Sequence, residues 1–141
     1  MVIVDASIAY KWYSSEKELS VQALKLYKSH LDRTEVLCAP SLLLLELANA
    51  WVTKTQLPKK QAHSNLKSLE SVGIVFEELN FELITKVIDF ADKYHVTAYD
   101  AMYAVLAQEK GCDLLTADSK FVAKVNLPFV KHLSEYSSNI N

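Results

Sequence analysis

The chain is poor in the residues that interrupt regular structure, because only two of its 141 residues are glycine and three are proline. A turn-rich all-β protein uses more of both, so we expect helices. The two cysteines, Cys38 and Cys112, stand apart among apolar residues, which excludes a disulfide framework and a CxxC metal site. We expect core thiols in a reducing compartment. The histidines show no HExxH-like spacing, so a zinc site is not expected either.

The chain also lacks a large charge of one sign and a long apolar run. Its formal net charge is −2, so no basic surface indicates a high-affinity duplex binder, although an enzyme that holds a short single strand is not excluded. Asp5 interrupts the N-terminal apolar run, which argues against a signal peptide. The run 36–52 contains Pro40, Glu46 and Asn49 and is too short and polar for a membrane span. We expect one cytoplasmic domain over residues 1–141.

Short apolar runs alternate with segments of helical spacing along the chain. We expect strands at 2–4, 36–39, 74–76, 114–116 and 129–131, and helices at 6–13, 19–31, 41–56, 59–71, 81–94, 98–110 and 119–125. Asn80 can cap the helix at 81–94, Gly111 can end the helix at 98–110, and the helix at 41–56 should be largely buried. This alternation predicts an α/β fold with a central, mainly parallel sheet and helices on both faces.

Four carboxylates stand alone in apolar surroundings: Asp5, Glu46, Asp100 and Asp118. Burying an unpaired carboxylate costs roughly several kcal/mol, and no lysine or arginine lies close in sequence to Glu46 or Asp100. Asp5 and Asp118 each follow an expected strand, where sites form in parallel sheets. Glu46 and Asp100 would come from helices beside that edge. If the fold brings the four together, they form an acidic metal site, whose expected chemistry is phosphodiester hydrolysis.

Each acid also has a structural interpretation. Asp5 and Asp118 can be helix N-caps, and Asp100 lies in the first turn of its helix, where the helix dipole favours an anion. Glu46 lies mid-helix, so a structural role would require a distant basic partner. Four such acids in one small domain favour a shared ligand over four independent explanations.

Four polar residues near the acids are candidates to orient the carboxylates or metal-bound water: Ser7, Asn49, Thr97 and Thr116. Ordinary capping and core hydroxyl roles remain open for each of them. Among the aromatic residues, Tyr103 is expected in the core, whereas Tyr99 could reach the cleft. The group Tyr10, Trp12 and Tyr13 could stack on a base or a partner, with core or interface packing favoured.

Two segments carry a family resemblance: TAYDAMYAVLA at 97–107, and, after Gly111, LTADSKF at 115–121. They resemble the T-x-Y-D-A-x-Y-x-x-L-A and L-T-x-D-x-x-F patterns of the PIN-domain nucleases. The segment VDAS at 4–7 is similar to the first acidic motif of that family, and LELA at 45–48 to its second. The motif order fits the whole chain, and its small size resembles the VapC-type toxins of toxin–antitoxin pairs.

The resemblance implies a three-layer α/β fold, an Mg²⁺- or Mn²⁺-dependent ribonuclease activity, a cognate antitoxin and a homodimer. Carried over by position, the catalytic and metal-binding acids are Asp5, Glu46, Asp100 and Asp118, supported by Thr116. Some family members have a further acid where this chain has Lys120, which puts a full second metal site in doubt.

Other functions remain open. One is a PIN-fold RNA-processing nuclease outside toxin–antitoxin systems, and another is a non-catalytic interaction module that retains the fold. A haloacid-type phosphatase would need an acid at position 7, where this chain has Ser7, and a response-regulator receiver would need an additional acidic pair.

Overall fold

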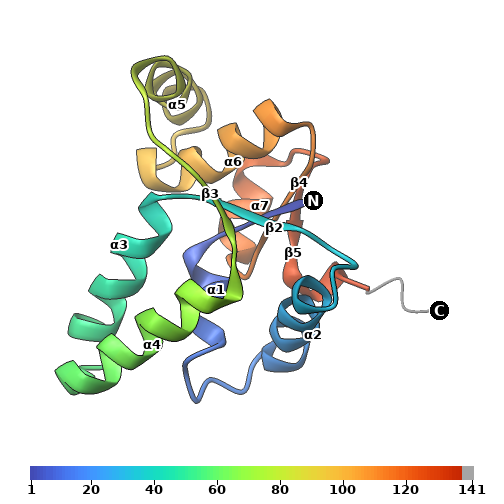
Figure 1. Ribbon diagram of the computed structural model, residues 1–141. Coiled ribbons are helices and arrows are strands. Elements are labelled where there is room, and N and C mark those ends of the chain that lie inside the picture. Colours follow the sequence, from blue (N-terminus) through green and yellow to red (C-terminus); the bar gives the residue numbers. More distant parts are fainter. Residues whose placement is uncertain (138–141) are drawn as a thin grey trace.

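The structure is a computed structural model that describes residues 1–137, and its centre is a parallel β-sheet (Figure 1). The described residues form one sheet of five strands in the order β3-β2-β1-β4-β5. The strands are β1 (Val2–Val4), β2 (Leu37–Pro40), β3 (Val75–Glu77), β4 (Asp113–Thr116) and β5 (Val130–His132). All four neighbouring pairs are parallel, so the carboxyl ends of the strands share one edge of the sheet.

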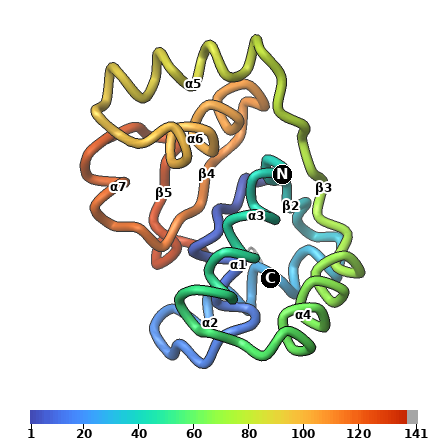
Figure 2. Tube along the Cα trace, turned by 90° about the vertical axis from the view of Figure 1, so that its left-hand side faces the viewer, coloured from blue at the N-terminus to red at the C-terminus, as the bar shows by residue number. Residues whose placement is uncertain are grey.

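Helices cover both faces of this sheet. They are α1 (Ala6–Lys11), α2 (Ser20–Leu31), α3 (Leu42–Asn49), the π-helical η1 (Ala50–Lys54), α4 (Lys59–Val72), α5 (Phe81–Tyr94), α6 (Ala98–Lys110), α7 (Ser119–Val125) and the 3₁₀ segment η2 (Leu133–Glu135). Figure 2 shows α1 to α4 on one side of the strands and α5 to α7 on the other. The chain runs in one direction across the sheet from β1 to β3 and then in the opposite direction from β3 to β4 and β5. Because the crossovers are right-handed, this reversal places the later helices on the other face of the sheet. The predicted three-layer α/β fold is confirmed.

Helix α6 is the central element of its layer. It packs against β1, β2 and β4, and its residues from Ala101 to Ala107 are all buried. A helix that is apolar on every side belongs in a core, and α5 covers its outer surface. Both predicted boundary signals are present: the Asn80 side chain accepts a hydrogen bond from the Leu83 amide at 2.9 Å, and Gly111 ends α6 with a φ of 62°.

The predicted boundaries need several corrections. The helix expected at 6–13 ends at Lys11, because Trp12 caps it and the Trp12 indole nitrogen donates to the Ala23 carbonyl in α2. Strands β2, β3 and β5 each begin and end one residue later than expected, and β4 begins one residue earlier, at Asp113. Pro40 is the last residue of β2 rather than the residue that follows the strand, because that position needs no amide proton.

The helix expected at 41–56 divides into α3 and η1, and it is less buried than predicted. Leu45 is 70% exposed and Val52 is 65% exposed. Cys38 is buried as predicted, whereas Cys112 is only partly buried. Segment η2 was not predicted. Within residues 1–137, no helix combines the length and apolar character needed to cross a membrane.

Candidate active site

Asp5 lies at the end of β1 and is held by three hydrogen-bond donors. Its Oδ1 accepts from the Ser7 hydroxyl at 2.6 Å and from the Ile8 amide at 3.2 Å, and its Oδ2 accepts from the Thr116 hydroxyl. The Ile8 contact makes Asp5 the N-cap of α1, so the structural alternative also applies. Val4 pairs with Leu115 in the sheet, which explains why the residues that follow them meet. The carboxylate therefore has a fixed orientation at the carboxyl edge.

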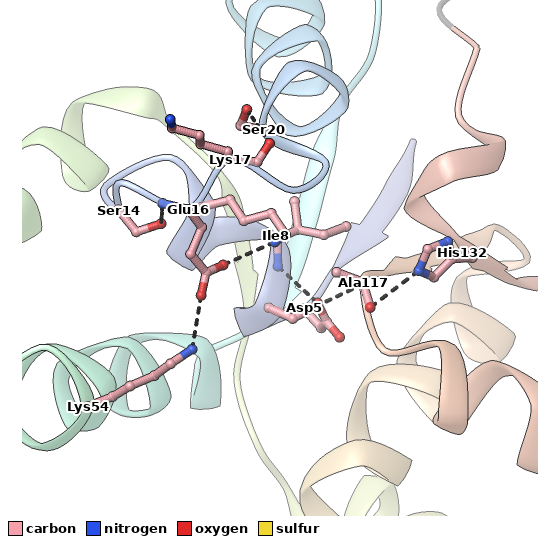
Figure 3. A network of polar contacts seen from close by, with 11 residues as sticks. Asp5, Ile8, Ser14, Glu16, Lys17, Ser20, Lys54, Ala117 and His132 are labelled. Carbon is pink, nitrogen blue, oxygen red and sulfur yellow. Dashed lines mark hydrogen bonds and ion pairs between the residues drawn. The ribbon is translucent and has the colours of Figure 1, made fainter.

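Ser7 and Thr116 also organise the loop after β4. The Thr116 hydroxyl accepts from the Asp118 amide at 3.0 Å, and the Ser7 hydroxyl accepts from the Ala117 amide at 3.0 Å. Thr116 is fully buried, and Figure 3 shows Ala117 between Asp5 and the His132 ring. Two hydroxyls thus connect the loops that follow β1 and β4, and two of the four predicted supporting residues, Ser7 and Thr116, contact Asp5 directly.

Asp118 and Asp100 are exposed residues at helix N-termini. Asp118 caps α7, because its Oδ1 accepts from the Phe121 amide at 3.0 Å. Asp100 lies in the first turn of α6, where its amide donates to the Thr97 hydroxyl at 3.1 Å. Thr97 is therefore the N-cap of α6. Capping accounts for one oxygen of Asp118, and the Asp100 carboxylate is exposed beside the Thr97 hydroxyl.

Glu46 on α3 is paired with a phenol rather than with a cation. The Tyr103 hydroxyl on α6 donates to Glu46 Oε1 at 3.0 Å, and the Tyr103 side chain is 2% exposed. The predicted core position of Tyr103 is confirmed, but its hydroxyl was not foreseen as the partner of Glu46. This hydrogen bond connects the two helical layers across the carboxyl edge of the sheet.

The four acids form one electrostatic cluster. Burial raises the pKa of Asp5, and the charge of Asp100 raises it further, although the hydrogen bonds from Ser7 and Thr116 oppose the shift. Burial also raises the pKa of Glu46, with added repulsion from Asp5 and Asp100 that the Tyr103 hydroxyl partly offsets. The pKa of Asp100 is raised by burial and by Asp118. A cation at this place would relieve the repulsion.

The donor set suits a hard divalent cation. All four candidate ligands are carboxylates, and Mg²⁺ and Mn²⁺ prefer oxygen. Within residues 1–137, no three histidine, cysteine, aspartate or glutamate side chains are close enough together to hold an ion as they stand. Mg²⁺ usually binds through one or two carboxylates, with waters and substrate phosphates completing its shell, so an open site of this kind fits it.

A cleft of about 370 Å³ is lined by Glu46 and Asp118 and also by basic side chains. Its lining residues are Ala6, Ser7, Tyr10, Lys11, Glu16, Glu46, Ala50, Lys54, Ala117 and Asp118. Lys11, Glu16 and Lys54 were not identified from the sequence. In the sequence, the available signal was their position near the segments that contain the acids. That signal is weak, because surface lysines and glutamates usually serve solubility.

The remaining candidates lie at the margins of the site. Asn49 and Tyr99 are exposed, Tyr99 at 64%, and their roles stay predictions. Tyr10 is buried, in agreement with the core packing that the sequence favoured, and it also lines the cleft. Tyr13 packs edge-on against Trp51, with ring centroids 5.8 Å apart, and Trp12 packs in the same way against Tyr27 at 5.4 Å.

Comparisons with known proteins point in one direction. The sequence model of the family described as PIN domain matches residues 2–126. No curated protein sequence matches the chain. Among solved structures, the VapC20 toxin of Mycobacterium tuberculosis, described as cleaving the sarcin–ricin loop, is 17% identical over 92% of this chain and 97% of that one, with a TM-score of 0.72.

Two similar structures are toxin–antitoxin complexes. The one from Klebsiella pneumoniae is 14% identical over 94% of this chain and 98% of the matched chain, with a TM-score of 0.70. The other is VapBC2 from Rickettsia felis, bound to a DNA fragment from its promoter, which is 15% identical over 94% and 97%, with a TM-score of 0.66. At these identities, the likeness is one of fold.

Proposed function

This chain belongs to the PIN-domain family, and we propose that it is a metal-dependent endoribonuclease that hydrolyses RNA phosphodiester bonds at the acidic cluster. One observation carries the proposal. Asp5 and Glu46 are partly buried and Asp100 is exposed, all three repel one another and have raised pKa values, and none of them has a lysine or arginine partner within residues 1–137. A fold that keeps such acids together without a counter-charge is suited to binding one.

In this proposal, Asp5, Asp100 and Asp118 hold Mg²⁺ or Mn²⁺ directly or through water. Such an ion, when bound there, would supply a water of lowered pKa and would neutralise charge on the phosphate. Ser7 and Thr116 fix the orientation of the Asp5 carboxylate through their hydrogen bonds. Glu46, fixed by Tyr103, would orient the attacking water or accept its proton. Because the attack is by water and not by the RNA 2′-hydroxyl, the products should carry a 5′-phosphate.

We further propose that the protein is the toxin of a type II toxin–antitoxin pair. The toxin–antitoxin complexes of the same fold support this assignment. Apolar side chains are exposed on two helices of the α1–α4 layer, at Val21, Leu24 and Leu31 of α2 and at Leu66 of α4. We expect a homodimer and an antitoxin that covers the cleft, all in the cytoplasm. The alternatives are an RNA-processing nuclease without an antitoxin, and a non-catalytic module.

The test is cleavage of defined tRNA and rRNA fragments with Mn²⁺, comparing the wild type with Asp5→Asn. Asparagine keeps an N-cap acceptor for α1, so the control should fold. We expect cleavage with 5′-phosphate ends for the wild type and none for the variant. Equal cleavage by both proteins would show a contaminating nuclease, and products with 2′,3′-cyclic ends would contradict the proposed mechanism.

A separate measurement addresses assembly. Sedimentation at micromolar concentration should show a dimer, and substituting Leu24 with a charged residue should dissociate it if α2 forms the interface. A monomeric wild type with full nuclease activity would contradict the dimer and leave the catalytic proposal standing.

A further inference from the structure

Two lysines that share one glutamate form a cationic wall in the cleft that Glu46 and Asp118 also line. Lys11 Nζ lies 3.0 Å from Glu16 Oε2, and Lys54 Nζ lies 3.1 Å from Glu16 Oε1 (Figure 3 shows Glu16 with Lys54). Lys54 also lies over the Tyr10 ring, 4.4 Å from its centroid. All four residues line the same cleft as Glu46 and Asp118. The site therefore has cations in the same cleft as its anions.

Lys54 reaches this wall because of a local change in the helix. Glu46, Ala50 and Lys54 are spaced four residues apart, and all three line the cleft. In a regular α-helix, residues four apart drift by roughly 40° per step, or about 80° between Glu46 and Lys54. Segment η1 (Ala50–Lys54) is π-helical, so each residue of its wider turn rotates by a smaller angle than in an α-helix. The smaller rotation offsets this drift and brings Lys54 closer to the face that carries Glu46. The π turn thus places a lysine beside the acidic face.

Lys11 is held more tightly than a typical surface lysine. Its side chain is only 8% exposed, whereas that of Lys54 is 61% exposed and that of Glu16 is 38% exposed. A lysine this buried needs a negative partner, and Glu16 supplies it. Burial alone would raise the pKa of Glu16, but the hydrogen bonds and charges of both lysines outweigh it and lower the pKa. Glu16 is therefore ionised at neutral pH.

Glu16 itself lies on a connection rather than within a regular element. It falls between α1, which ends at Lys11, and α2, which begins at Ser20, and its amide donates to the Ser14 hydroxyl at 3.3 Å. A carboxylate on such a connection can move away from the lysines at lower cost than one fixed in a helix.

We propose that Lys11 and Lys54 form an anion subsite for a backbone phosphate of the RNA next to the scissile bond, and that Glu16 is the counterion which this phosphate replaces. The inference rests on the proposed nuclease function. A chain with a net charge of −2 and an acidic site repels a polyanion, so a local cationic wall is needed to hold the strand. Lysine binds phosphate as a point charge, and the Tyr10 ring keeps Lys54 directed at the cleft.

The test is RNA binding without cleavage, measured in EDTA by fluorescence anisotropy of a labelled single-stranded RNA across a range of salt concentrations. The variants are Lys11→Met, Lys54→Met and Glu16→Gln. The matched control is Lys28→Met, which removes the same charge from the end of α2, at the amino edge of the sheet where the chain leads into β2. Melting temperatures are measured on the same preparations.

We expect Lys11→Met and Lys54→Met each to weaken binding roughly fivefold and to lower the magnitude of the salt slope by about 0.7, the value for one lost phosphate contact on a single strand. Glu16→Gln should strengthen binding about threefold, because the lysines lose a competing anion. Lys28→Met should leave both quantities unchanged.

Binding by Lys54→Met equal to that by Lys28→Met, with both folded, would overturn the subsite. Unchanged or weaker binding by Glu16→Gln would overturn the counterion role. Displacement of the RNA by a glutamate peptide of the same charge and concentration would assign the wall to an acidic protein segment instead. Because binding is measured without metal, a failure here is separate from a failure to cleave RNA with Mn²⁺.

Discussion

Glu46→Gln separates a catalytic role of Glu46 from a structural one, because the side-chain hydrogen-bond partner of Glu46 within residues 1–137 is neutral. The Tyr103 hydroxyl donates to Glu46 Oε1 at 3.0 Å, and a glutamine carbonyl can accept the same hydrogen bond. The substitution therefore keeps the contact between α3 and α6. It removes a negative charge whose pKa is raised by burial, Asp5 and Asp100.

The stability expected for this variant follows from those contacts. Without metal, Glu46→Gln should unfold at a temperature equal to or above that of the wild type. Glu46→Leu, in contrast, leaves the buried Tyr103 hydroxyl without an acceptor, which costs roughly 1–3 kcal/mol. For a domain of this size, each kcal/mol corresponds to a shift in Tm of about 3–5 °C. The additional variant Tyr103→Phe completes a double-mutant cycle that isolates the hydrogen bond.

Activity is measured on the same preparations. If Glu46 holds or deprotonates the attacking water, Glu46→Gln should lose on the order of a hundredfold or more in cleavage rate. A destabilised Glu46→Gln protein with normal specific activity would refute the reasoning, because it would make the charge structural and the reaction independent of it.

The remaining predictions concern the metal, pH and the Asp5 carboxylate. Mg²⁺ or Mn²⁺ should raise the melting temperature by linkage, and Asp100→Asn should reduce that rise; an equal rise in both proteins would remove Asp100 from the ligands. Because the pKa of Glu46 is higher in the folded than in the unfolded protein, its contribution to stability is largest at low pH. That contribution is fully present below the pKa of an unfolded glutamate, about 4.3, and is lost as the pH rises through the pKa of the folded protein. The stability of Glu46→Gln relative to the metal-free wild type, from urea unfolding, should therefore increase with pH, and a constant difference would contradict the shift. Thr116→Val removes a hydrogen bond that lowers the Asp5 pKa, so the acidic limb of the cleavage profile should move to higher pH and Thr116→Ser should restore it.

The positions of Asp5, Ser7 and Thr116 were predictable because the relevant contacts follow from sheet topology. β1 and β4 are neighbours, and Val4 pairs with Leu115, so the residues just beyond them must meet at the carboxyl edge. Alternation of strands and helices was enough to predict that edge. The catalytic roles themselves remain predictions.

The partner of Glu46 was not predictable in the same way. Tyr103 is 57 residues away and reaches Glu46 from the opposite helical layer, so the contact depends on how both layers pack. The cationic wall was missed for a related reason. The π-helical turn of η1 brings Lys54 toward the face of Glu46, whereas an α-helical projection of residues 41–56 places the two about 80° apart.

The capping role of the site acids has a genetic consequence. Asp5 and Asp118 each accept an amide proton at a helix N-terminus, and asparagine serves as well as aspartate in that position. At Asp5, the Thr116 hydroxyl can rotate to accept from an asparagine amide instead of donating to a carboxylate. Aspartate and asparagine codons differ by a single base. One transition in the gene would thus yield a chain that folds and keeps its binding surfaces but has lost a charge at the site, so selection for harmless alleles would be expected to reach these two positions first.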